Sequence, residues 1–329
     1  MANKEQVQLF VRNAHDCSGG YSMRTQRPLA LADDRVMVCP MPPAERLADA
    51  EPTAESFLAE LASPSRGPIT ADDVAVVVAH PDDETIGCGA HLCRLRGSSI
   101  VLVTDGAPRN LVDARTHGFA TADAYAAARD LEIRRALALA EVAPHQLVTL
   151  GVPDQQAARR LAGLTRRLAV LFSARRIRTV LTHAYEGGHP DHDAAAFAVH
   201  AAAALLGRRG HKVSIIEMPF YHLGACGMVL QRFATPIGSH AIEIKLSDAQ
   251  MLLKRRMVAA HATQQVVLRM LSIEAERFRP APQYDFATPP DELLYENHAW
   301  GMTGARWRTL SAAALRTLGL GDGMCRSRS

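Results

Sequence analysis

Residues 74–84 read VAVVVAHPDDE, and this stretch sets the class of fold to expect. From Val74 to Ala79 it is a continuous apolar run rich in β-branched side chains. Such a run is typical of a strand buried on both faces, as the inner strands of parallel sheets are. The run leads directly into His80-Pro81-Asp82-Asp83-Glu84, where four of five residues can bind a metal ion or transfer a proton. The stretch therefore predicts a buried strand with reactive side chains at its carboxyl end.

Outward from this run, short apolar strands alternate with helical patterns. Further strands are predicted at residues 100–104, 147–150, 179–182 and 213–218, and helices at 80–96, 121–142, 155–175 and 193–206. This alternation indicates βαβ units, and hence a Rossmann-like α/β fold with a mostly parallel sheet and helices on both faces. After Phe220 the rhythm weakens. There we expect an edge strand at 242–246 and helices at 247–271 and 305–318.

The first 70 residues differ from the rest of the chain. Prolines at positions 40, 42, 43, 52, 64 and 68 interrupt the second half of this stretch, and only residues 53–61 carry a short helical pattern. We interpret residues 1–70 as an N-terminal extension packed on a single main domain of residues 71–329. A loose tail is the alternative, because the stretch is rich in proline and polar residues.

Composition excludes several classes of protein. Lys and Arg total 37 against 34 Asp and Glu, a net charge of +3, and aromatic residues make up 5%. Nucleic-acid binding is therefore not expected. The longest nearly apolar stretch, residues 194–206, is shorter than the ~20 residues of a membrane span, so we expect no stable membrane insertion. The amino terminus has no signal-peptide pattern, and six cysteines form no disulfide framework, which predicts a cytoplasmic protein.

A second group of metal-binding residue types follows the predicted strand 179–182. Residues 183–192 read HAYEGGHPDH, with His189 and His192 three positions apart and Asp191 between them. Carboxyl ends of parallel strands meet at one edge of a sheet, so both motifs should lie there. A cation there would relieve the repulsion between Asp82 and Asp83. Two histidines and a carboxylate with an open position suit catalytic zinc, and they also suit non-haem Fe(II).

With these motifs the chain resembles the PIG-L (LmbE-like) family of zinc-dependent N-acetylglucosaminyl deacetylases. The matching stretches are residues 80–90 (HPDDETIGCGA), 104–106 (TDG), 150–154 (LGVPD) and 189–192 (HPDH), together with Arg129 and Glu132. The resemblance covers roughly residues 73–265. It implies an LmbE-like fold and removal of an N-acetyl group from an amino sugar, most often a GlcNAc unit of a glycan, glycolipid, thiol glycoside or antibiotic.

The resemblance also implies roles for individual residues. The zinc ligands carried over are His80, Asp83 and His192. Asp82 is the general base, and His189 stabilises the oxyanion or protonates the leaving amine. Asp191 orients or tunes that histidine. Whether Asp82 or His189 gives the amine its proton stays open, as do the oligomeric state and the metal in the cell, Zn²⁺ or Fe²⁺.

One position departs from the family pattern. Some members place a tyrosine two residues before the histidine that corresponds to His189, where it helps to hold the tetrahedral intermediate. This chain has Gly187 there. Tyr185 and Tyr221 are the two candidates to take its place, and the sequence does not choose between them.

Two other functions are compatible with the sequence. Gly87 and Gly89 follow the first strand and suggest a methyltransferase or nucleotide-binding loop, but Leu92 stands where G-x-G-x-x-G needs its third glycine. The glycines are explained more simply by a helix packed closely behind the metal loop. The second alternative is a metal-stabilised binding module without turnover.

Several further residues have both a functional and a structural interpretation. Arg109 follows the second strand and is our candidate for binding substrate. Arg129 and Glu132 are interpreted as an i,i+3 pair on a helix. His183 is either a hydrogen-bond partner of a ligand or a core residue. For Trp300 and Trp307 we favour packing over lining of a sugar-binding mouth. His200 and His261 are expected to be structural.

Overall fold

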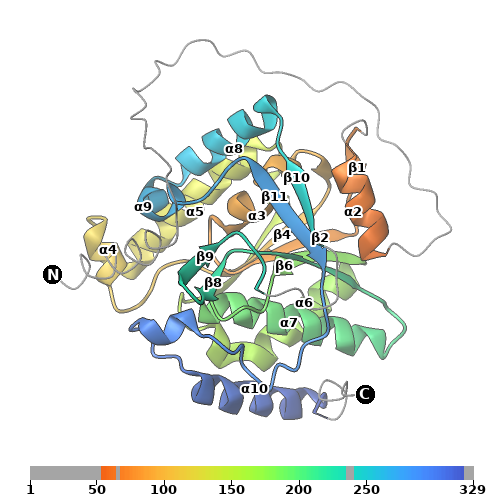
Figure 1. Ribbon diagram of the computed structural model, residues 1–329, viewed down its shortest axis with the longest axis vertical. Helices are drawn as coiled ribbons and strands as arrows, with labels where there is room; N and C mark the ends of the chain where they lie inside the picture. Colours follow the sequence, from red (N-terminus) through yellow and green to blue (C-terminus); the bar gives the residue numbers. More distant parts are fainter. Residues whose placement is uncertain (1–52, 64–66, 235–240, 322–329) are drawn as a thin grey trace.

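In the computed structural model, the chain is described over residues 53–63, 67–234 and 241–321 (Figure 1). Its centre is a seven-stranded sheet in the order β10-β11-β7-β6-β2-β4-β5. The strands are β2 (Val74–Val78), β4 (Ser99–Thr104), β5 (Leu147–Val152), β6 (Thr179–His183), β7 (Ser214–Met218), β10 (Ile242–Lys245) and β11 (Ala275–Pro280). The five strands from β7 to β5 are parallel, whereas β10 and β11 pair antiparallel. The predicted mixed α/β class with a mostly parallel sheet is confirmed.

Helices cover both faces of this sheet, and successive side chains of strand β2 pack alternately against the helices on one face and on the other. Val74, Val76 and Val78 belong to a core cluster with helices α2 (Ala54–Ala62), α3 (Asp83–Leu92), α5 (Ala122–Leu139) and α8 (Asp248–Ala260). Ala75 and Val77 belong to a second cluster with α6 (Leu161–Ala174), α7 (Pro190–Gly207) and α10 (Gly304–Leu318). Figure 1 shows the two helix layers above and below the sheet. All five residues of β2 are buried, as a continuous apolar run predicts.

The remaining elements are short. They are β1 (Ile69–Thr70), paired in parallel with β3 (Leu95–Arg96), the hairpin of β8 (Tyr221–Gly224) and β9 (Gly227–Leu230), the helices α4 (Val112–Thr116) and α9 (Gln265–Leu268), and 3-10 turns at Pro144–Gln146, Ala157–Arg160, Ala262–Gln264 and Leu294–Asn297. Thr53 caps α2, whose Phe57 and Leu61 are buried in the core. Residues 1–52 of the expected extension lie outside the described residues, so the division at residue 70 stays a prediction.

Four predicted helices differ clearly from the structure in their bounds. The helix expected to reach Arg96 ends at Leu92, and Leu95–Arg96 forms strand β3 instead. The helix expected from Ser247 to Leu271 ends at Ala260, where the backbone of His261 leaves the helical region. The helix expected from residue 155 begins only at Leu161, after a 3-10 turn. The helix expected from residue 193 already begins at Pro190. In each case the apolar pattern placed the helix correctly, and local turns set its ends.

Strand β11 was not predicted, because its sequence AERFRP carries three charged residues. Two of them are buried and paired. Glu276 contacts Lys254 and His91, and Arg279 donates to Glu217. Charge paired across elements in this way cannot be recognised from the strand alone.

Among the residues that the structure describes, no helix is both long and apolar enough to cross a membrane. The cytoplasmic location stays a prediction.

Candidate active site at the carboxyl edge of the sheet

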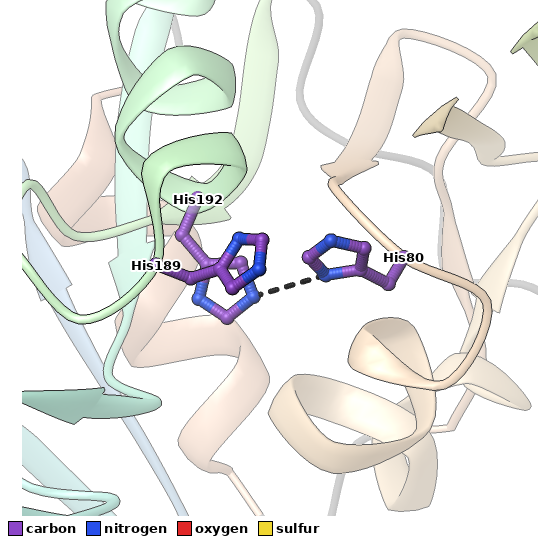
Figure 2. A group of neighbouring side chains, drawn as sticks. All are labelled: His80, His189 and His192. Atoms are coloured by element: carbon purple, nitrogen blue, oxygen red, sulfur yellow. Dashed lines mark hydrogen bonds between the residues drawn. The ribbon is translucent and has the colours of Figure 1, made fainter. Parts of the chain in front are cut away.

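The two motifs meet at the carboxyl ends of the parallel strands, where α/β proteins usually bind ligands. A cavity of about 260 Å³ opens at this edge. Near its floor lie His80, Asp82, Asp83, Asp154, His189 and His192. His80 follows β2, and His189 and His192 stand at the start of α7, so residues more than a hundred positions apart face one another across the cavity (Figure 2).

Three side chains form a nearly regular triangle at this floor, with both carboxylate oxygens of Asp83 taking part. Nδ1 of His80 lies 3.2 Å from Nε2 of His192 and 3.3 Å from Oδ2 of Asp83. Nε2 of His192 lies 3.5 Å from Oδ1 of Asp83. Ligand atoms bound at about 2.0–2.1 Å to one tetrahedral ion are separated by about 3.3 Å. The side chains of this triangle, His80, Asp83 and His192, are therefore spaced closely enough for a zinc-sized cation to lie among them.

Electrostatics favours the ligating form of two of these side chains. Burial would raise the pKa of Asp83, but His192 and His183 hold it well below its ordinary value, so the carboxylate is charged. Burial and the neighbouring His183 lower the pKa of His192 to about 4, so its ring is neutral. A charged carboxylate and a neutral imidazole are the forms that bind metal ions.

Asp154 is a functional candidate that the sequence reasoning missed. Its Oδ1 lies 3.2 Å from Nε2 of His80, on the side of the ring that faces away from the triangle. Burial alone would lower the pKa of His80, but Asp154 and Asp191 raise it well above its ordinary value. Carboxylates in this position orient a ligating histidine and increase its basicity. The signal was available, since Asp154 ends the stretch LGVPD directly after β5.

Other groupings of the same side chains could also hold a metal ion. Within the described residues, ligand atoms come together in the sets His80/His189/His192, Asp83/His183/His192 and His80/Asp154/Asp191. Every set contains His80 or His192. The cavity floor therefore offers more donors than a single metal ion needs.

Asp82 is held in an unusual backbone conformation next to this centre. Its φ of 148° lies in a region that L-residues rarely adopt, a strain that is often found at functional sites. Arg129 holds it there: Nη2 donates to Oδ2 of Asp82 at 3.0 Å and to the carbonyl of Pro81 at 2.8 Å, and Nη1 donates to Gly106. Burial raises the pKa of Asp82 to about 7, against the opposing effect of Arg129.

The predicted pairing of Arg129 with Glu132 is wrong. Glu132 instead accepts hydrogen bonds from the backbone N–H and hydroxyl of Thr263. Both side chains are buried, and the helix α5 uses them to bind two different loops. The i,i+3 spacing was a poor guide here, because surface pairing applies to exposed helix faces.

His189 and Asp191 also differ from the expected arrangement. The backbone N–H of Asp191, rather than its carboxylate, donates to Nδ1 of His189. The carboxylate of Asp191 accepts from the backbone of Gln155 and Ala157 and lies 3.6 Å from Nε2 of His80. Burial and the nearby histidines hold the pKa of His189 well below its ordinary value. His189 is thus a neutral ring with its proton on Nε2, and Asp191 positions His80 instead.

Arg109, the predicted substrate-binding residue, does not line the cavity. Its guanidinium pairs with Asp105, four residues away, and donates to the carbonyl of Ala107, two residues away. The short loop after β4 folds back on itself, so the charge of Arg109 is neutralised within the loop.

His183 accepts from the backbone N–H of Ala79 and stacks on His192, which makes it a support for the ligand triangle.

Of the two tyrosines that the sequence left open, only Tyr221 lines the cavity. Its ring centroid lies 5.2 Å from that of His192. The hydroxyl of Tyr185 instead donates to the carbonyl of Thr288, and its ring packs among Phe286 and Trp307. Position in the cavity therefore favours Tyr221.

The two tryptophans have different places. Trp307 is fully buried in the core, in agreement with the packing interpretation. Trp300 lines the cavity, with its ring 4.4 Å from His189 and stacked on His298. The minor interpretation, a residue at the mouth of the site, describes Trp300 better.

The glycines after β2 are explained by packing. A Cβ at Gly87 would lie 2.6 Å from Sδ of Met218, at the end of β7. Gly87 and Gly89 are both buried inside α3, against the sheet and α8. This contact accounts for the glycine pattern without a nucleotide.

The loop before α7 has no room for a side chain at Gly188. An added Cβ would lie 1.9 Å from the backbone oxygen of Tyr221. We expect Gly188→Ala to lower the free energy of unfolding by about 1–3 kcal/mol, measured by urea denaturation, because backbone must move to relieve the clash. The control is Gly163→Ala on α6, where nothing lies within 4 Å and alanine should stabilise by about 0.5–1 kcal/mol. Wild-type stability of Gly188→Ala would contradict this contact.

The structure combines a mostly parallel sheet, flanked by helices, with buried His and Asp residues at its carboxyl edge that could hold a metal ion. These two features define the class of the protein as an α/β protein with a candidate metal site. Within that class, residues 75–203 match the family model described as PIG-L, GlcNAc-PI de-N-acetylase. The central part of the chain, residues 75–203, is therefore similar to the PIG-L family, as the motifs predicted. Both motifs lie inside the matched residues, whereas Trp300 and α9 lie beyond them.

Solved structures share the fold. A deacetylase–bog complex of the teicoplanin biosynthesis pathway has a TM-score of 0.50 and 17% identity, covering 64% of this chain and 98% of that chain. A deacetylase triple mutant (Orf2*T) of the same pathway has a TM-score of 0.50 and 19% identity, with the same coverage. The N,N'-diacetylchitobiose deacetylase from Pyrococcus horikoshii has a TM-score of 0.47 and 18% identity, covering 64% and 84%. None of the curated proteins matches the chain.

Proposed function

We propose that this protein is a metal-dependent hydrolase that removes the N-acetyl group from an amino sugar of the GlcNAc type. The observation that carries the proposal is the triangle of His80, Asp83 and His192, with edges of 3.2–3.5 Å, within the residues that match the PIG-L family model. The substrate is a small molecule or glycan with an N-acetylated amino sugar. The donor set suits Zn²⁺ and also Fe²⁺.

The residues around the triangle have the properties that amide hydrolysis requires. A bound zinc ion would supply Lewis acidity, polarising the amide carbonyl and making water a better nucleophile. Asp82 takes the proton of the attacking water, and Arg129 holds its carboxylate at the cavity floor. His189 presents Nε2–H toward the developing oxyanion, a contact often worth about 3 kcal/mol. Asp82 or His189 then returns a proton to the leaving amine, and acetate is released.

Acetate release from a panel of N-acetylated sugars tests the proposal. The protein is stripped with a chelator and assayed with and without added Zn²⁺ or Fe²⁺. We expect at least one GlcNAc-type substrate to be hydrolysed, activity to fall at least 100-fold on chelation, and a metal ion to restore it, because the nucleophile depends on the ion. Full activity of chelated, metal-free protein would contradict the proposal.

The variant His80→Ala tests the metal site in that experiment, and His145→Ala is its control. His80→Ala removes one corner of the triangle and should abolish metal-restored activity. His145→Ala changes a histidine on a 3-10 turn near the amino end of β5, remote from the cavity lining, and should leave the response to metal unchanged. Equal behaviour of the two variants would contradict the assignment of His80.

A further inference from the structure

The size of the cavity limits how much of a substrate it can hold. At about 260 Å³ it lies below the ~300–1,000 Å³ of pockets that enclose drug-sized ligands. If the proposed function holds, the N-acetyl group and its sugar occupy this volume. Whatever is bonded to the sugar must then lie across the rim, so the chemistry of the rim identifies the rest of the substrate.

One side of the rim is apolar. It consists of side chains from α3, from the end of β9, from α9 and from the turn that follows α9: Ile86, Leu230, Val266, Val267 and Leu271. The same lining contains polar side chains, among them Asp113, Thr116 and His117. His117 stacks on Tyr125, whose hydroxyl accepts a hydrogen bond from Gln264, close in sequence to Val266. A substrate that contacts both kinds of side chain needs a polar sugar and an apolar substituent.

The two valines are exposed without a packing reason. Val266 is 59% and Val267 38% exposed, whereas the next residue of α9, Leu268, is buried. The other exposed large apolar residues of the described chain, Leu131, Val170 and Leu252, stand singly on other helices. Clustered exposed apolar groups that continue a binding cavity are typical of ligand contacts, while single ones need no explanation.

The charges around the cavity argue against an anionic substituent. Among the described lining residues, Arg129 is the one Lys or Arg, and it is committed to Asp82 and two backbone carbonyls. The carboxylates of Asp82, Asp83, Asp113 and Asp154 line the same cavity. A phosphate bonded to the sugar and lying away from the metal ion would find no uncommitted Lys or Arg among these lining residues.

We propose that the natural substrate is an amphiphilic glycoside, in which the N-acetyl amino sugar carries an apolar, non-anionic aglycone that lies across Val266, Val267 and Leu230. The proposal rests on the deacetylase function above and names its substrate class. It separates this chain from an enzyme for phosphodiester-linked glycolipids, which needs a cationic site next to the sugar.

A matched series of N-acetylglucosaminides tests it in the holoenzyme: the methyl glycoside, the octyl glycoside and an octyl phosphodiester of the same sugar. Each buried CH₂ is worth up to about fourfold in affinity, so a few contacts suffice for a clear effect. We expect kcat/KM for the octyl glycoside to exceed that for the methyl glycoside at least about tenfold. The phosphodiester should be at least about tenfold poorer than the octyl glycoside.

The double variant Val266→Thr/Val267→Thr keeps side-chain shape and replaces one methyl group of each valine by a hydroxyl. It should reduce the octyl-to-methyl ratio of kcat/KM to below about threefold. The control Val170→Thr changes a valine that is 70% exposed on α6, far from the rim, and should keep the full ratio. Thermal unfolding of both variants checks that they fold alike.

The outcomes separate the two levels of the argument. Failure to hydrolyse any glycoside with any metal ion would overturn the proposed function. Equal kcat/KM for methyl and octyl glycosides, or a preference for the phosphodiester, would overturn the substrate class and leave the function standing. A valine variant with lowered thermal stability and an unchanged ratio would show that the rim is covered by the chain itself, for example by residues 1–52, and would also overturn the inference.

Discussion

Asp82→Asn should lower kcat by about 10²–10⁴-fold while the protein keeps its metal ion. The amide has the shape of the carboxylate but cannot accept a proton from water, and general base catalysis contributes about that factor. Asn also tolerates positive φ better than most residues, so the strained backbone at this position should persist. Steady-state kinetics and metal content by elemental analysis measure the two effects separately.

The control for this experiment is Asp130→Asn, on the exposed side of α5. Asp130 pairs with Arg134 at the surface, so its charge should matter little for catalysis. Activity of Asp82→Asn within about tenfold of wild type, with metal bound, would show that another group is the base. Loss of the metal ion would instead show that Asp82 is itself needed to hold it.

Lys254→Met should lower the free energy of unfolding by about 3–5 kcal/mol, the effect of breaking a buried ion pair. The reason lies in α3, which is interrupted at Cys88 by non-helical backbone angles. In a continuous helix, the N–H of Ala90 would bond to the carbonyl of Ile86. Here Ala90 donates to Oε1 of Glu276 at 2.8 Å, and Nζ of Lys254 donates to the carbonyl of Ile86 at 2.7 Å.

The Lys254–Glu276 ion pair, 2.6 Å long and fully buried, thus stands in place of a helix hydrogen bond. Since α3 begins with Asp83, the pair also holds the segment that carries one corner of the metal triangle. Urea unfolding of Lys254→Met measures the loss. The control is Arg255→Met, which removes an exposed cation from the same helix and should change stability by less than about 0.5 kcal/mol. A loss below about 1 kcal/mol for Lys254→Met would contradict this role.

Much of the fold could be predicted because its signals are local. The apolar runs of β2 and β4 identify strands buried on both faces, and the helical patterns between the strands identify α5, α6 and α7. Residue type and position after a strand were also enough to choose the two motifs. Strand β11 was missed because its charges are neutralised by residues distant in the chain.

The site was predicted less completely than the fold. The sequence placed His80, Asp83 and His192 as candidates, but Asp154, the support from Arg129 and the contact of Trp300 with His189 appeared only in three dimensions. Arg109 was chosen for its place after a strand, and the structure shows that a nearby carboxylate already occupies it. Position in the sequence indicates which residues reach the edge of the sheet, but not which partner each one meets there.

By itself, the sequence determined that the central strands are buried, that the sheet is mostly parallel, and where the two motifs lie. Runs of apolar residues and clusters of metal-binding residue types are properties of neighbouring residues. Tertiary structure alone decided the triangle of ligand atoms, the ion pair inserted into α3 and the apolar rim beside Val266. Each of these joins segments far apart in the chain. Contacts of about 3 Å between such segments, and the burial of their charges, exist only once the segments are packed together.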